Sequence, residues 1–70
     1  MRRQDLISRV AFAARRAGLC WRLERQGANH EVWLLGGTSI AVPRHRELKE
    51  LTALGIFRKL ESELGKDWWR

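Results

Sequence analysis

Residues 19–43 read LCWRLERQGANHEVWLLGGTSIAVP, and this stretch decides the fold class. Apolar and charged side chains alternate from Trp21 to Glu24, which is typical of a strand with one buried face. The apolar runs that follow are separated by short segments rich in glycine, which favour tight turns. The predicted strands are residues 19–26, 30–35 and 38–42, closed by Pro43, and the predicted turns are Gln26–Asn29 and Gly36–Gly37. We therefore expect three antiparallel strands in sequential order.

A helix is predicted on each side of these strands in the sequence. Residues 4–17 place six apolar side chains on one side of a helix, and Gly18 is positioned as a left-handed C-cap. A second helix is predicted from Leu51 onward, with Thr52 as N-cap and Gly65 as C-cap. The apolar sides consist of Leu6, Ile7, Val10, Ala13, Ala14 and Ala17 in the first helix and of Ala53, Ile56, Phe57, Leu60 and Leu64 in the second.

The order helix, three strands, helix predicts one α+β domain over residues 1–70. Both helices are expected on one face of a three-stranded antiparallel sheet, which leaves the other face open to a ligand. A chain of this length buries only about 60% of the surface that its unfolded form exposes, so a bound partner would add useful stability.

The chain carries a formal net charge of +6, and this charge is unevenly distributed. Residues 1–30 hold seven arginines and two acidic residues, a balance of +5, whereas residues 31–70 hold seven basic and six acidic residues, a balance of +1. Such asymmetry favours a polyanionic partner, either a nucleic acid or an acidic protein surface.

Cysteine content and hydropathy exclude several classes of protein. Cys20 is the only cysteine, so no internal disulfide forms, and with only two histidines beside it the chain cannot assemble a four-ligand zinc site from cysteine and histidine. Charged residues interrupt the N-terminal segment, which argues against a signal peptide, and no apolar run approaches the roughly 20 residues of a membrane span. We expect a cytoplasmic protein without a zinc site of this kind.

Five short motifs are distributed over nearly the whole chain. They are Arg3–Ile7, Ala17–Gly18, Arg25–His30, Ile40–His45 and Thr52–Ile56. In their order and spacing the sequence resembles the HicA family of toxins from bacterial type II toxin–antitoxin systems. Where that family usually has Gly-Ser-His before the second strand, this chain has Ala28-Asn29-His30, with the glycine at position 27.

The resemblance implies both a fold and an activity. It implies an αβββα domain similar to double-stranded-RNA-binding domains, and a metal-independent endoribonuclease that cleaves messenger RNA. It also implies that His30 is the catalytic histidine, and that a HicB-like antitoxin protein masks the active surface.

One histidine is chemically sufficient for slow RNA cleavage. The substrate supplies its own nucleophile, the 2′-hydroxyl, and an imidazole that exchanges a proton near neutral pH can assist as base or acid. The residues alone also allow His30 to be a solvated or structural histidine at the start of a strand. The arginines that flank the strand ends are candidates to neutralise RNA phosphates: Arg22, Arg25, Arg44 and Arg46.

Other residues are given simpler interpretations. His45 is expected to be a solvated loop residue rather than a second catalytic group. Glu31 is expected on the face opposite His30, as at most a contact for the antitoxin. Phe12 is interpreted as packing beneath another segment, although with Arg9 and Arg16 it would also form a partner-binding ridge.

The tryptophans are expected mainly in the core. Trp33 is assigned to the core in preference to an RNA-facing sheet. Trp68 and Trp69 are expected to cover the alanine-rich first helix, with base stacking or insertion into a partner as the alternative.

Two other functions fit parts of the sequence. The first is a non-catalytic module that binds structured RNA through shape and phosphate contacts. Its expected lysine cluster is missing, since only Lys49 lies near the start of the second helix. The second is a small DNA-binding regulator, which fits the charge but not a three-stranded centre, because a helix-turn-helix needs consecutive helices.

Overall fold

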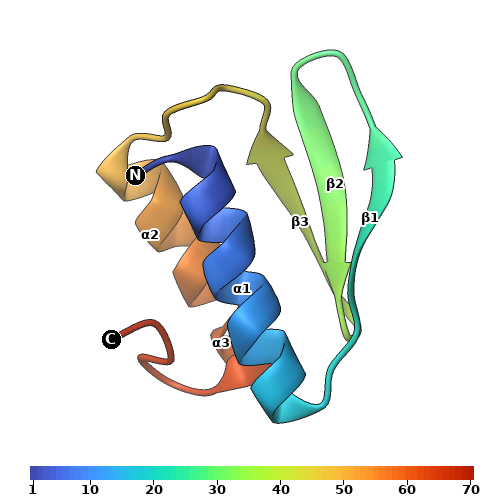
Figure 1. The fold of residues 1–70 in the computed structure, drawn as a ribbon, viewed down its shortest axis with the longest axis vertical. Helices are drawn as coiled ribbons and strands as arrows, with labels where there is room; N and C mark the ends of the chain where they lie inside the picture. Colours follow the sequence, from blue (N-terminus) through green and yellow to red (C-terminus); the bar gives the residue numbers. More distant parts are fainter.

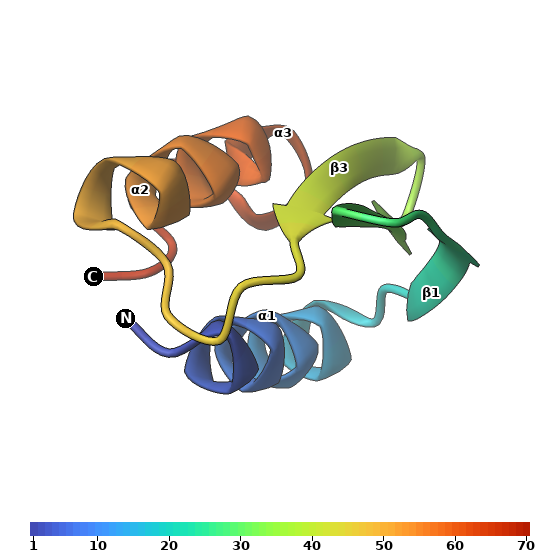
Figure 2. The same cartoon turned by 90° about the horizontal axis from the view of Figure 1, so that it is seen from above.

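A three-stranded antiparallel sheet forms one layer of the molecule and the helices form the other (Figure 1). The computed structural model describes all residues from 1 to 70. Its elements are α1 (Arg3–Ala17), β1 (Trp21–Gln26), β2 (His30–Leu35), β3 (Thr38–Pro43), α2 (Glu50–Lys59) and α3 (Glu61–Leu64). Seen from above, all three helices lie on the same side of the sheet (Figure 2). The predicted α+β class and the order of the elements are confirmed, and α3 is an addition.

The strands follow one another in the order β1-β2-β3, with β2 in the centre. The pairing of β2 with β3 is regular from His30 opposite Pro43 to Leu35 opposite Thr38. The pairing of β1 with β2 contains a bulge at Glu24, so that Leu23 pairs with Trp33 and Arg25 pairs with Val32. The extra residue reverses the alternation in β1, because side chains directly opposite each other project from the same face of a sheet.

The core lies between the sheet and the helices. Leu6 and Val10 of α1 and Leu35 and Val42 of the sheet are completely inaccessible to solvent. The full set of buried apolar residues is Leu6, Val10, Ala14, Leu35, Ile40, Val42, Leu48, Ala53, Ile56, Phe57 and Leu60. Trp33 is half-buried against this cluster and stacks on Trp21, with 4.6 Å between ring centroids, so its assignment to the core side of the sheet is confirmed.

The ends of the helices follow the predictions only in part. Gly18 adopts the predicted left-handed conformation (φ 71°) at the end of α1. The second helix begins two residues before the predicted Thr52 N-cap, because the backbone of Lys49 is still extended and its carbonyl accepts the N–H of Ala53. The helix also breaks at Leu60, whose N–H is shared between two carbonyl groups at 3.2 Å, before the chain continues as α3 to Gly65.

The C-terminal tryptophans cover the core, but over α2 rather than over the alanine-rich α1. The indole N–H of Trp68 donates to the carbonyl of Phe57 at 2.7 Å, and the Trp69 ring stacks on the Phe57 ring. The tail therefore stops short of Phe12, which is 62% exposed. The prediction that another segment covers Phe12 is wrong, because the tail finds its aromatic partner and its hydrogen-bond acceptor on α2.

Candidate functional site

His30 lies at one end of the central strand, on the outer face of the sheet. The alternation of β2 directs Glu31 and Leu35 to the helices, where both are buried, and directs His30, Val32 and Leu34 away from them. His30 is exposed, so its imidazole is accessible to a ligand that lies across this face.

The turn that precedes His30 is held by its own backbone. The N–H of Gly27 donates to the carbonyl of His30 at 2.8 Å. A Cβ atom at position 27 would stand only 3.0 Å from that same oxygen, so glycine allows this close approach. The position of glycine at 27 thus has a local structural reason.

Two of the four predicted arginines lie beside His30. Arg25 pairs with Val32, the next outer-face residue after His30 on β2, and it reaches this face because of the bulge at Glu24. Arg44 donates its backbone N–H to Asn29 and its Nη1 to the carbonyl of Gly27, both at 3.0 Å. The remaining N–H groups of both guanidinium groups are available to a phosphate next to the imidazole.

The other two arginines lie farther away. Arg22 occupies the same face, but its partner Leu34 is four residues along β2 from His30, which is roughly 13 Å of strand. Arg46 lies in the loop after β3, near the start of α1, where its carbonyl accepts the N–H of Arg3. His30, Arg25 and the more distant Arg22 therefore share the outer face of the sheet, Arg44 lies against the turn that precedes His30, and the structure does not bring Arg46 to them.

A buried ion pair supports this end of the sheet from the inner side. The guanidinium of Arg3 pairs with the carboxylate of Glu31, and the Nε of Arg3 donates at 3.0 Å to the carbonyl of Pro43, the residue that pairs with His30. Glu31 also accepts the indole N–H of Trp33 at 3.1 Å. Glu31 is only 8% exposed, so its interpretation as a contact for the antitoxin is wrong. Because a buried charge needs a partner, the position of Glu31 on the buried face of β2 indicates that a buried counter-charge exists.

His45 does not belong to the site. It is exposed in the loop after β3 and borders a shallow hollow with Lys49 and Thr52 at the start of α2. This placement agrees with its interpretation as a loop residue.

The outer face offers positive charge and one imidazole, without a deep cavity. No three histidine, cysteine, aspartate or glutamate side chains cluster as metal ligands would. None of the helices has the length and apolar character that crossing a bilayer requires. No protein-family model, curated protein sequence or solved structure matches this chain.

Proposed function

We propose that this protein is an endoribonuclease of the HicA type, the toxin of a type II toxin–antitoxin pair, with His30 as its general acid or base. The observation that carries the proposal is the exposed position of His30 at the end of β2, with Arg25 and Arg44 on either side. This arrangement can hold a phosphodiester by its charged oxygens while an imidazole reaches its reacting atoms. The similarity to double-stranded-RNA-binding domains forms part of the same proposal.

The proposed reaction is an internal transesterification followed by strand separation. The 2′-oxygen of one nucleotide forms a bond to the adjacent phosphorus, and the bond from phosphorus to the 5′-oxygen of the next nucleotide breaks. The products are a 2′,3′-cyclic phosphate and a free 5′-hydroxyl. His30 either removes the 2′-hydroxyl proton or donates a proton to the leaving 5′-oxygen, and water completes the other transfer. Arg25 and Arg44 stabilise the charge that develops on the phosphoryl oxygens.

We propose single-stranded messenger RNA as the substrate. The 2′-oxygen must come into line with the leaving 5′-oxygen, which a flexible single strand allows and an A-form duplex does not. An open face with arginines spread along roughly 13 Å of strand suits an extended backbone.

The proposal includes a partner and a location. A HicB-like antitoxin would cover the outer face, where the half-buried Val32 and Leu34 lie among arginines and offer an apolar centre with a charged rim. Because the substrate is messenger RNA, the proposed location is the cytoplasm.

The test compares variants of the full chain on a labelled single-stranded RNA in excess EDTA. His30→Ala is expected to lower the cleavage rate by about 10² to 10⁴-fold, the usual contribution of general acid–base catalysis, and to leave RNA affinity within a few-fold of wild type. His45→Ala is the matched control and is expected to cleave normally. A single 2′-deoxynucleotide at the cut site should block cleavage there.

Two results would contradict the proposal. Equal cleavage by the wild type and His30→Ala would remove His30 from the mechanism. Binding of RNA without cleavage by either protein would favour the non-catalytic RNA-binding module, which uses the same arginines.

A further inference from the structure

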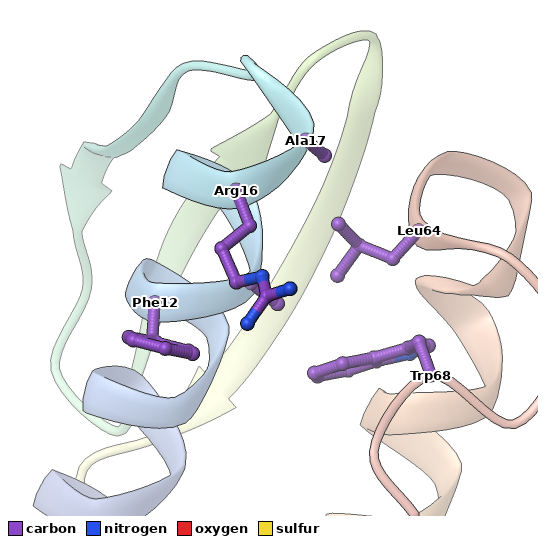
Figure 3. Close-up of a pocket in the computed structure, with 6 residues that line it drawn as sticks. Phe12, Arg16, Ala17, Leu64 and Trp68 are labelled. Atoms are coloured by element: carbon purple, nitrogen blue, oxygen red, sulfur yellow. The ribbon is translucent and has the colours of Figure 1, made fainter.

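A second exposed feature lies on the helix side of the molecule, away from His30. Phe12 and Arg16 of α1 face Leu64 and Trp68 across an open hollow of about 410 Å³ (Figure 3). Five of its six lining residues are apolar; the lining consists of Phe12, Ala13, Arg16, Ala17, Leu64 and Trp68. We propose that this hollow, here called the α1 hollow, binds an acidic segment of a partner protein that inserts one large apolar side chain.

The lining of the α1 hollow is suited to an apolar ligand. Phe12 is 62% exposed although it belongs to the regular helix α1, and the end of the Trp68 ring points toward α1 (Figure 3). Between them, Ala13 and Ala17 leave space instead of filling it. Large aromatic side chains beside a small-residue floor form the kind of pocket into which an interface anchor fits.

The rim of the α1 hollow is positively charged and favours a ligand with negative charge. From Ser8 to Ala17 the helix carries three arginines and no acidic residue. Arg16 lines the hollow and Arg9 precedes Phe12 by three residues on the same side of the helix, whereas Arg15 borders a different hollow beside Trp21. Neither Arg9 nor Arg16 is paired with a carboxylate, and the guanidinium of Arg16 lies over the Phe12 ring, 5.8 Å from its centroid. These cations are therefore free to pair with acidic side chains that flank the inserted anchor.

The same charges argue against a second copy of this chain as the occupant. A two-fold contact through the α1 hollow would place Arg9 and Arg16 of one copy against those of the other, in a protein whose net charge is already +6. The arginines of the rim can hold phosphates as well as carboxylates, but the alanines and Leu64 of the lining offer no hydrogen bonds to bases, so the lining fits an apolar side chain better than a nucleotide. An apolar centre with a cationic rim is best matched by an acidic amphipathic peptide.

This inference does not depend on ribonuclease activity, and its test uses binding alone. Random linear peptides displayed on phage are selected on the full chain, and the enriched peptides are synthesised and titrated by fluorescence anisotropy. Enriched peptides should be net acidic with a leucine, phenylalanine or tryptophan. Phe12→Ala and Arg16→Glu should each weaken their binding by at least about 10-fold, as loss of an anchor contact does.

Leu51→Ala is the matched control, because Leu51 is an even more exposed apolar residue (83%) that does not line the α1 hollow. It should leave peptide affinity unchanged, and circular dichroism should show all three variants folded. Failure to enrich acidic peptides, or equal binding to Phe12→Ala and wild type, would overturn the proposal. So would a loss of affinity for labelled single-stranded RNA in Phe12→Ala without any peptide binding, which would assign the α1 hollow to nucleic acid.

Discussion

Breaking the ion pair between Arg3 and Glu31 is expected to destabilise this protein strongly, because it leaves one charge without its partner in a mostly buried position. The side chains of Arg3 and Glu31 are only 22% and 11% exposed, and the pair connects α1 to the central strand. Glu31→Gln removes the negative charge, keeps the volume, and keeps an oxygen that can accept the indole N–H of Trp33. The substitution therefore leaves the Arg3 guanidinium without its counter-charge and changes little else.

The expected loss in the free energy of unfolding follows from the burial of the pair. Removing one partner of a fully buried pair costs about 3 to 5 kcal/mol, and the residual exposure of Arg3 lets water and the Pro43 carbonyl satisfy part of the guanidinium. We therefore expect Glu31→Gln to lower the free energy of unfolding by about 2 to 3 kcal/mol. The total free energy of unfolding is roughly 4 to 10 kcal/mol for a chain of this size. The corresponding drop in Tm is roughly 10 to 20 °C.

Urea denaturation followed by tryptophan fluorescence measures this loss. A double-mutant cycle with Arg3→Met separates the pair from its surroundings, because the double variant no longer buries an unpaired charge. The two single losses should together exceed the loss in the double variant by about 1 to 2 kcal/mol. Single losses below about 0.5 kcal/mol, or strict additivity in the cycle, would refute this account of the ion pair.

The other predictions concern two glycines, the tail and the arginines. Gly36→Ala should destabilise the protein by more than about 1 kcal/mol in urea melts, because position 36 has φ +56° and a Cβ there would lie 2.6 Å from a carboxylate oxygen of α3. A Cβ atom added at Gly55 in α2 has no neighbour within 4 Å, so Gly55→Ala should stabilise the protein by about 0.5 to 1 kcal/mol in the same measurement. A lower stability of this variant would contradict the open space at position 55. Trp68→Phe keeps a ring but loses its hydrogen bond, and should lower the unfolding free energy by about 0.5 to 1.5 kcal/mol. Arg25→Ala should weaken binding of single-stranded RNA and reduce the slope of log affinity against log salt by about 0.7, whereas Arg46→Ala should leave both nearly unchanged; equal effects would contradict the placement of these side chains.

The sequence predicted the architecture because its signals are local. Gly18 and the Gly36–Gly37 pair mark positions where the chain must turn, and both turns occur there. The bounds of β2 are those predicted, from His30 to Leu35, because a turn bounds the apolar run on each side. The position of His30 at the start of β2 follows from the same signals.

The features that escaped prediction depend on contacts between distant residues. Regular alternation would have placed Arg25 toward the helices, and only the pairing with β2 reveals the bulge that brings it beside His30. The predicted helix runs on to Gly65 and gives no sign of the break at Leu60, whose N–H is shared between two carbonyl groups. The partner of Glu31 is Arg3, a residue of another element, so the sequence shows that a partner is needed without showing which.

The sequential order of the strands has a consequence for how fast the protein assembles. Each strand pairs with its neighbour along the chain across a turn of two or three residues, so both hairpins close short loops at little entropic cost. The contact between Arg3 and Pro43 is different, because it joins residues 40 positions apart. Folding should therefore be limited by the docking of α1 onto a sheet whose pairings are local, and should be complete within milliseconds of the chain being released from denaturant.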